Sequence, residues 1–145
     1  MKKDMLNEPN RQIDYITARY DNSSNESQSL FSPSICDTRT FGLKKYYNHP
    51  DIQIVLDFGD SKIKYLIERF CWMVQDGRRF KSDDLVSGIT TDCDLKLFEI
   101  TEGDEKLLRI IVSDKCHRFP EDENCEFPYN LQYMSTEELN AKINL

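Results

Sequence analysis

An alternating strand followed directly by an amphipathic helix is the feature that most constrains how this chain can fold. Apolar residues occupy every second position from 52 to 58, which is the period of a β-strand. After Gly59, apolar residues recur at helical spacing on one face, at Ile63, Leu66, Ile67, Phe70, Met73 and Val74. Gly77 supplies a helix stop. Because a helix with one apolar face must cover another layer, this pair predicts a helix packed on a sheet.

Weaker patterns predict the remaining elements. These are a helix at residues 8–20, strands at 38–43, 94–100 and 106–112, a hairpin turn at 101–104 and a final helix at 135–145. The final helix begins at a capping box, because Ser135 is followed three residues later by Glu138. The order of elements predicts an α+β fold. It has one largely antiparallel sheet packed against a main helix at about 60–76, with short N- and C-terminal helices.

Length and composition indicate one domain that does not enter a membrane. The chain has 145 residues, of which 39% are hydrophobic and 31% charged, and this length fits a single core. We expect an N-terminal helix and polar linker at 1–30, a core at 36–133 and a C-terminal helix at 135–145. No apolar run approaches the roughly 20 residues that span a bilayer. The first residues are too polar for a signal peptide, so we expect a cytoplasmic protein.

The negative charge is concentrated in the last third of the chain. The net charge is −7, and residues 91–145 hold 6 basic and 13 acidic side chains, whereas the first 90 residues are neutral overall. Such a surface disfavours direct nucleic-acid binding and suits a basic protein partner. The side chains predicted to bind that partner are Asp114, Glu121, Asp122, Glu123 and Glu126. The alternative interpretation is a solvated loop that only aids solubility.

Cysteines and short motifs offer little support for catalysis. The five cysteines contain no C-x-x-C pair and are expected to be free thiols in a reducing compartment. Cys116, His117 and Cys125 could converge on a metal, but their spacing matches no closed zinc pattern. The G-x-G-x-x-G, P-loop, H-E-x-x-H and G-x-S-x-G motifs are absent. We therefore assign no catalytic residue, metal or cofactor, and the sequence leans against an enzyme without deciding the matter.

Histidine and arginine side chains supply an alternative site. His49 and His117 could act as general acids or bases near neutral pH. The arginines near the helix stop and on the last strand suit recognition of a carboxylate or phosphate. The residues of this alternative ligand pocket are His49, Arg78, Arg79, Asp92, Arg109 and His117. Basic residues after a helix also favour its negative end, and a turn histidine commonly bonds to backbone.

Four short signatures, in order, carry a family resemblance. They are Thr40-Phe41-Gly42-Leu43, His49-Pro50-Asp51, Gly77-Arg78-Arg79-Phe80 and Phe127-Pro128-Tyr129. Over roughly residues 36–133 the chain resembles the bacterial family known as domain of unknown function 4262. It departs from the family where Asp51 replaces Glu, Glu121 replaces Asp and Tyr129 replaces Trp. The resemblance implies a fold and a bacterial or phage setting, and no catalytic residue.

Two functions are therefore expected as alternatives. The first is a non-enzymatic protein-binding module, most concretely a cytoplasmic immunity or inhibitor protein that neutralises a basic toxin or nuclease through its acidic C-terminal surface. We expect the aromatic residues on either side of Pro128 to hold the acidic segment onto the core. The second is a small enzyme or small-ligand-binding domain that uses the histidine, arginine and aspartate residues named above.

Overall fold

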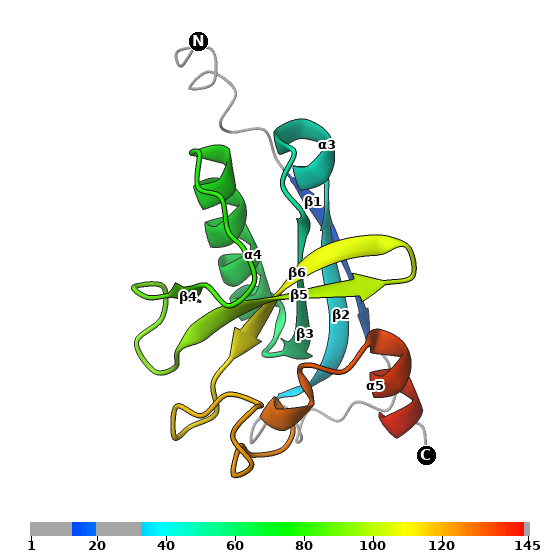
Figure 1. The fold of residues 1–145 in the computed structure, drawn as a ribbon, viewed down its shortest axis with the longest axis vertical. Helices are drawn as coiled ribbons and strands as arrows, with labels where there is room; N and C mark the ends of the chain where they lie inside the picture. Colours follow the sequence, from blue (N-terminus) through cyan, green and yellow to red (C-terminus); the bar gives the residue numbers. More distant parts are fainter. Residues whose placement is uncertain (1–12, 20–32, 144–145) are drawn as a thin grey trace.

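A six-stranded sheet lies at the centre of this computed structural model, which describes residues 13–19 and 33–143 (Figure 1). The strands are β1 (Asp14–Arg19), β2 (Ser34–Phe41), β3 (Asp51–Asp57), β4 (Leu85–Val86), β5 (Leu95–Glu102) and β6 (Glu105–Val112). The helices are α3 (Leu43–Tyr47), α4 (Asp60–Gln75) and α5 (Thr136–Ile143), with a 3₁₀ turn, η1, at Tyr129–Leu131.

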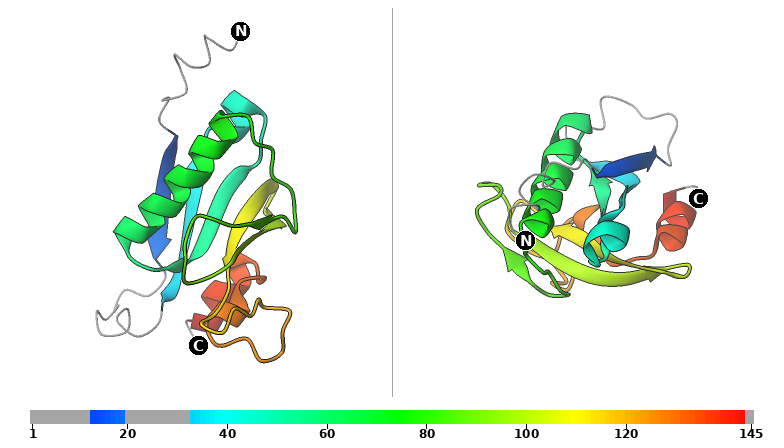
Figure 2. Two further views of the ribbon diagram at one scale, coloured as in Figure 1. Left: turned by 90° about the vertical axis from the view of Figure 1, so that its left-hand side faces the viewer. Right: turned by 90° about the horizontal axis from the view of Figure 1, so that it is seen from above.

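The sheet is mixed but mostly antiparallel. Its strand order is β1-β2-β3-β6-β5-β4, and only the central β3–β6 pair is parallel. Helix α4 runs along one face of the sheet, and α5 lies on the far side of it (Figure 2). The predicted α+β fold, with one largely antiparallel sheet under a main helix, is confirmed.

The strand and helix that dominated the sequence pattern occupy the core. All six apolar residues of the helical stripe are buried in α4. Every residue of β3 is buried, including the polar Gln53, although alternation predicts one exposed face. The second face is covered because Gln53 bonds Arg109, which in turn bonds the backbone of residues 132 and 134. The chain beyond residue 131 therefore closes the side of the sheet that α4 leaves open.

The helix predicted at residues 8–20 is contradicted by a strand over residues 14–19. Residues 14–19 form β1, paired antiparallel with β2, and residues 8–12 and 20 lie outside the described residues. Helical spacing groups Ile16 with Ile13, but Ile16 is 61% exposed whereas Ile13 is buried. Residues 15–17 are aromatic or β-branched, and the Thr17 hydroxyl bonds that of Thr38 across the strands at 2.8 Å. Pairing with β2 outweighs a weak helical pattern.

Turn and cap signals in the sequence predict local structure well. A Gly103-Asp104 turn joins β5 to β6 where the hairpin was expected. The capping box of α5 is confirmed, because the Ser135 N–H donates to Glu138 Oε1 at 2.8 Å and the Glu138 N–H donates to Ser135 Oγ at 3.1 Å. The strand expected at 38–43 ends at Phe41, since Gly42 has a φ of 117° and turns the chain into α3. In the described residues, no helix combines the length and apolar composition that a membrane span requires.

Candidate functional site

His49 is a buried structural residue at the end of the molecule formed by α3 and the C-terminus of α4. Its side chain is 1% exposed, Nδ1 lies 2.8 Å from the Pro50 carbonyl, and Nε2 accepts the Phe80 N–H at 3.1 Å. Burial lowers the pKa of His49, and the nearby Arg79 lowers it further. Both ring nitrogens are thus occupied in a neutral imidazole, which leaves neither free to exchange a proton with a substrate.

Asp51 extends the same structural unit. Its Oδ1 accepts the Thr40 hydroxyl at 2.7 Å and the Leu43 N–H at 2.9 Å, and Thr40 Oγ1 accepts the Ile52 N–H at 2.9 Å. Three of the four signatures that carry the family resemblance therefore meet here through side chain to backbone hydrogen bonds. The side chains of Thr40, His49 and Asp51 supply the hydrogen bonds that join β2, α3, β3 and the segment after α4.

Arg109 is buried in the centre of the sheet rather than in an open pocket. It is fully buried, and its guanidinium donates to Gln53 Oε1 at 2.8 Å, to the Gln132 carbonyl at 2.7 Å and to Glu102 Oε2 at 2.6 Å. Glu102 also accepts the N–H and hydroxyl of Thr136. This network fastens the C-terminal segment to the sheet and leaves Arg109 no access to a ligand.

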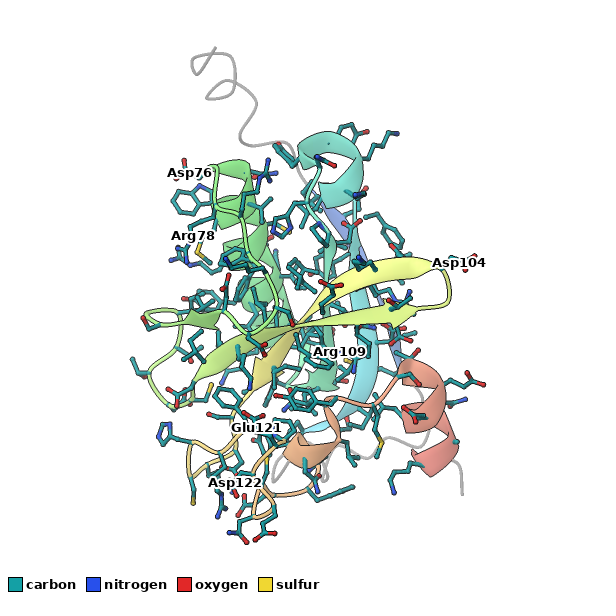
Figure 3. The ribbon with its side chains drawn as sticks, in the orientation of Figure 1. Asp76, Arg78, Asp104, Arg109, Glu121 and Asp122 are labelled. Carbon is teal, nitrogen blue, oxygen red and sulfur yellow. The ribbon has the colours of Figure 1, made fainter. Side chains whose placement is uncertain are left out.

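The six side chains of the alternative ligand pocket do not share one site. His117 is exposed, with Nδ1 3.2 Å from Asp94 Oδ2, and belongs to the loop after β6. That loop and α3, which directly precedes His49, lie at opposite ends of the molecule (Figure 1). Arg78 projects near the end of α4, far from the central Arg109 (Figure 3). Its guanidinium lies over the Phe80 ring, 4.8 Å from the centroid. A pocket built from these side chains is not present.

The predicted partner-binding segment is an ordered loop built around one buried carboxylate. We call residues 114–128 the acidic loop. Asp114 is 1% exposed and accepts four hydrogen bonds: the N–H groups of Cys116, Arg118 and Glu126, and Arg118 Nε. Burial raises the pKa of Asp114, but the hydrogen bonds from Arg118 and Glu126 outweigh it and lower the pKa to about 2. Asp114 organises the loop and does not itself face a partner.

The other predicted partner-binding residues divide into two kinds. Glu121 accepts Lys96 Nζ at 2.7 Å and also bonds the Tyr133 hydroxyl, so it fastens the loop to β5 and the C-terminal segment. Glu121 is nevertheless exposed, and so are Asp122, Glu123 and Glu126, which have no such contact with β5. Figure 3 shows Asp122 at the lower edge of the molecule. Four of the five acids predicted to bind a partner therefore lie at the surface, and Asp114 is buried.

Internal pairing removes positive charge from this half of the molecule. Three of the six basic residues after residue 90 are buried or half-buried and pair with acids: Lys96 with Glu121, Arg109 with Glu102 and Arg118 with Asp114. The remaining bases are Lys106, Lys115 and Lys142, which are exposed together with most of the acids. The surface of residues 91–145 thus keeps the whole acidic excess with few basic side chains among it.

Phe127 is a residue of interest that the sequence pattern misassigned. We expected it to pack on the core with Tyr129, but Phe127 is 71% exposed while Pro128 is buried. Tyr129 does pack inward, with its ring centroid 6.5 Å from that of Phe58. The acidic loop therefore presents an aromatic ring next to its carboxylates.

The cysteines are all free thiols. Cys36, Cys71 and Cys125 are buried, Cys93 is half-buried and Cys116 is exposed. Cys125 Sγ donates to the Arg118 carbonyl at 3.4 Å, and burial raises its pKa to about 11, so it is a packed thiol. In the part of the chain that the structure describes, no group of three or more His, Cys, Asp or Glu side chains is arranged to hold a metal ion.

A cleft of about 660 Å³ lies between the start of α4 and the ends of β5 and β6. Its lining includes Phe58, Lys62, Asp92, Cys93, Lys115 and Tyr129. Of the six residues of the alternative pocket, Asp92 alone lines it.

Comparison with family models, with curated proteins and with solved structures finds no match for the chain.

Proposed function

We propose that this chain is a non-enzymatic protein-binding module whose acidic loop binds a basic protein. The most concrete form of the proposal is a cytoplasmic immunity or inhibitor protein that neutralises a basic toxin or nuclease. The observation that carries it is that Phe127, Asp122, Glu123 and Glu126 are all exposed on one loop held by a buried carboxylate. Aromatic residues are enriched at protein interfaces, and polar and charged side chains lie mainly at the interface rim.

Preorganisation of the loop supports binding rather than solubility alone. The Glu126 N–H, immediately before Phe127, donates to Asp114 Oδ2 at 2.9 Å, and Glu121 is held by Lys96. A loop already fixed in its bound conformation loses less conformational entropy when a partner docks. Exposed carboxylates then accelerate encounter with a basic surface and make the association rate depend on salt.

The acidic surface also fits the mechanism of a nuclease or toxin inhibitor. A protein that binds phosphate does so with a surplus of lysine and arginine, and a set of exposed carboxylates competes for that same surface. The chain needs no catalytic group for this role. The proposed bacterial setting rests on the family resemblance stated above, which the comparisons leave as a prediction.

The proposal is tested by capturing partners from host lysate with matched charge variants. Wild-type protein is expected to retain a basic protein at low salt and to lose much of it at moderate salt. The double variant Asp122→Lys/Glu123→Lys and the variant Phe127→Ala are expected to lose it at both. The control is Asp104→Lys/Glu105→Lys, which makes the same charge change at the β5–β6 turn, away from the acidic loop (Figure 3).

Retention of the same protein by the control and not by the loop variants supports the proposal. If both charge variants lose it equally, net charge rather than the loop is responsible and the proposal fails. It also fails if no protein is retained in a salt-dependent way. A captured protein of basic pI is then assayed for nuclease or growth-inhibiting activity with and without the chain, which tests the inhibitor role directly.

A further inference from the structure

The cleft between α4 and the ends of β5 and β6 has features that binding through the acidic loop does not use. Its volume of about 660 Å³ falls in the range of small-molecule sites. Leu66, Leu95 and Val112 contribute buried apolar surface to its lining. The Phe58 and Tyr129 rings lie beside each other at its edge. The cleft therefore offers apolar and aromatic contact to a flat hydrophobic group.

The charged groups of the cleft favour an anion. Lys62 and Lys115 both line it, are exposed, and form no ion pair with any residue that the structure describes. Asp114 also lines it, but its two oxygens are occupied by loop backbone and by Arg118. Of the two carboxylates that line the cleft, Asp114 is paired with Arg118 and Asp92 is not. With Asp114 offset by Arg118, the lining keeps two lysines against one aspartate, whereas the charged groups around the Tyr129 hydroxyl are the acids Asp92, Asp114 and Glu126.

Two polar groups of the cleft have capacity for a ligand. The Tyr129 hydroxyl has no hydrogen-bond partner among the described residues, and burial raises its pKa, so it remains a donor at neutral pH. Cys93 Sγ lies 3.2 Å from Thr90 Oγ1, and burial raises the pKa of its thiol. A protonated thiol is a weak nucleophile, so the chemistry of the cleft is reversible binding rather than covalent catalysis.

We propose that this cleft binds a small organic anion with a flat apolar body, such as an aromatic carboxylate. The carboxylate lies at Lys62 and Lys115. The ring packs on Phe58 and on the apolar lining. The cleft adjoins the acidic loop, since Asp114 and Lys115 line it, but Asp122, Glu123 and Phe127 of the proposed partner-binding surface do not.

The test is a titration of the full chain with naphthalene-2-carboxylate, followed by amide chemical shifts in NMR. Saturable shifts are expected at Lys62, Cys93 and Tyr129, with a Kd of about 1 mM or tighter. The neutral isostere naphthalene-2-carboxamide is expected to bind about fivefold more weakly, which corresponds to one exposed ion pair. The absence of saturable shifts at these residues, or equal affinity for the two probes, would overturn the proposal.

Matched variants separate the lysine contact from a general charge effect. Lys62→Ala is expected to reduce the preference for the carboxylate without abolishing it, because Lys115 remains. Lys64→Ala is the control, because Lys64 is exposed on the same helix and does not line the cleft. If Lys64→Ala weakens binding as much as Lys62→Ala, the proposed contact is wrong. Lys62→Ala should still capture the basic partner. Loss of ligand binding in the cleft can therefore be distinguished from loss of partner binding.

Discussion

The two ends of the molecule are each organised by one buried polar side chain, and the two side chains differ in charge. At the end formed by α3 and the C-terminus of α4, the neutral ring of His49 joins the Pro50 carbonyl and the Phe80 N–H. At the other end, the ionised carboxylate of Asp114 joins three backbone N–H groups and the guanidinium of Arg118.

Because one side chain is neutral and the other is charged, their hydrogen bonds to the backbone respond differently to acid. A neutral histidine holds backbone in place only while it stays unprotonated, whereas a carboxylate does so only while it stays charged. The end built on His49 is therefore sensitive to mild acid, and the acidic loop is not. Each prediction below changes one end and leaves the other as its reference.

The largest effect is expected from Asp114→Ala. Removing this carboxylate leaves Arg118 without its partner and three backbone N–H groups without an acceptor, so the free energy of unfolding should fall by about 3 kcal/mol. Urea denaturation measures the change. Asp104→Ala, at an exposed turn, is the control and should stay within about 0.5 kcal/mol of wild type. A loss below about 1 kcal/mol for Asp114→Ala would contradict the assigned role.

An intermediate effect is expected from pH. The pKa of His49 is lowered in the folded state from its ordinary value of 6.5, so the unfolded chain binds the proton more readily. The stability that His49 provides is therefore complete above pH 6.5 and declines as pH falls below that value. Asp114, with a pKa of about 2, keeps its contribution until pH falls below its ordinary value of 3.8.

Hydrogen exchange separates these two responses. Between pH 7.5 and pH 5, the protection factor of the Phe80 amide should fall severalfold after correction for the intrinsic exchange rate, while that of the Glu126 amide stays constant. In His49→Gln, which cannot titrate, the Phe80 response to pH should disappear. Equal changes at both amides would show that the whole chain loosens and that His49 is not responsible.

The smallest effect on stability is expected from Phe127→Ala. Because this ring is 71% exposed, its removal should change the free energy of unfolding by less than about 0.5 kcal/mol, even though capture of the basic partner is lost. Thermal denaturation provides the measurement. Tyr129→Ala is the comparison, since its half-buried ring packs against Phe58 and its removal should destabilise the chain clearly. Comparable losses for both variants would mean that Phe127 is part of the core.

Local patterns in the sequence predicted the parts of the fold that local interactions determine. The period of β3, the apolar stripe of α4 and the Ser135–Glu138 capping box each involve residues close in the chain. Residues 14–19 were misassigned because their helical spacing is weak and the partner strand that decides their conformation lies about 20 residues away.

The candidate site was only partly predictable, because acidic residues look alike in a sequence. Asp114 and Asp122 belong to one charged cluster, yet Asp114 is buried at the centre of the loop and Asp122 is exposed. Which one turns inward depends on the N–H groups that loop closure brings together, and spacing does not show these. Arg109 was misassigned for a related reason, since its acceptors come from residues 53, 102, 132 and 134.

The position of Arg109 also defines the shortest fragment of this chain worth expressing. Its guanidinium donates to the carbonyls of Gln132 and Met134. A fragment that stopped at residue 131 would therefore leave a buried cation without two of its hydrogen-bond acceptors. Glu102, its ionic partner, would lose its bonds to Thr136 as well. Fragment boundaries, fusion sites and proteolytic trimming should therefore leave everything through Thr136 in place, even though the cleft and the acidic loop both end before it.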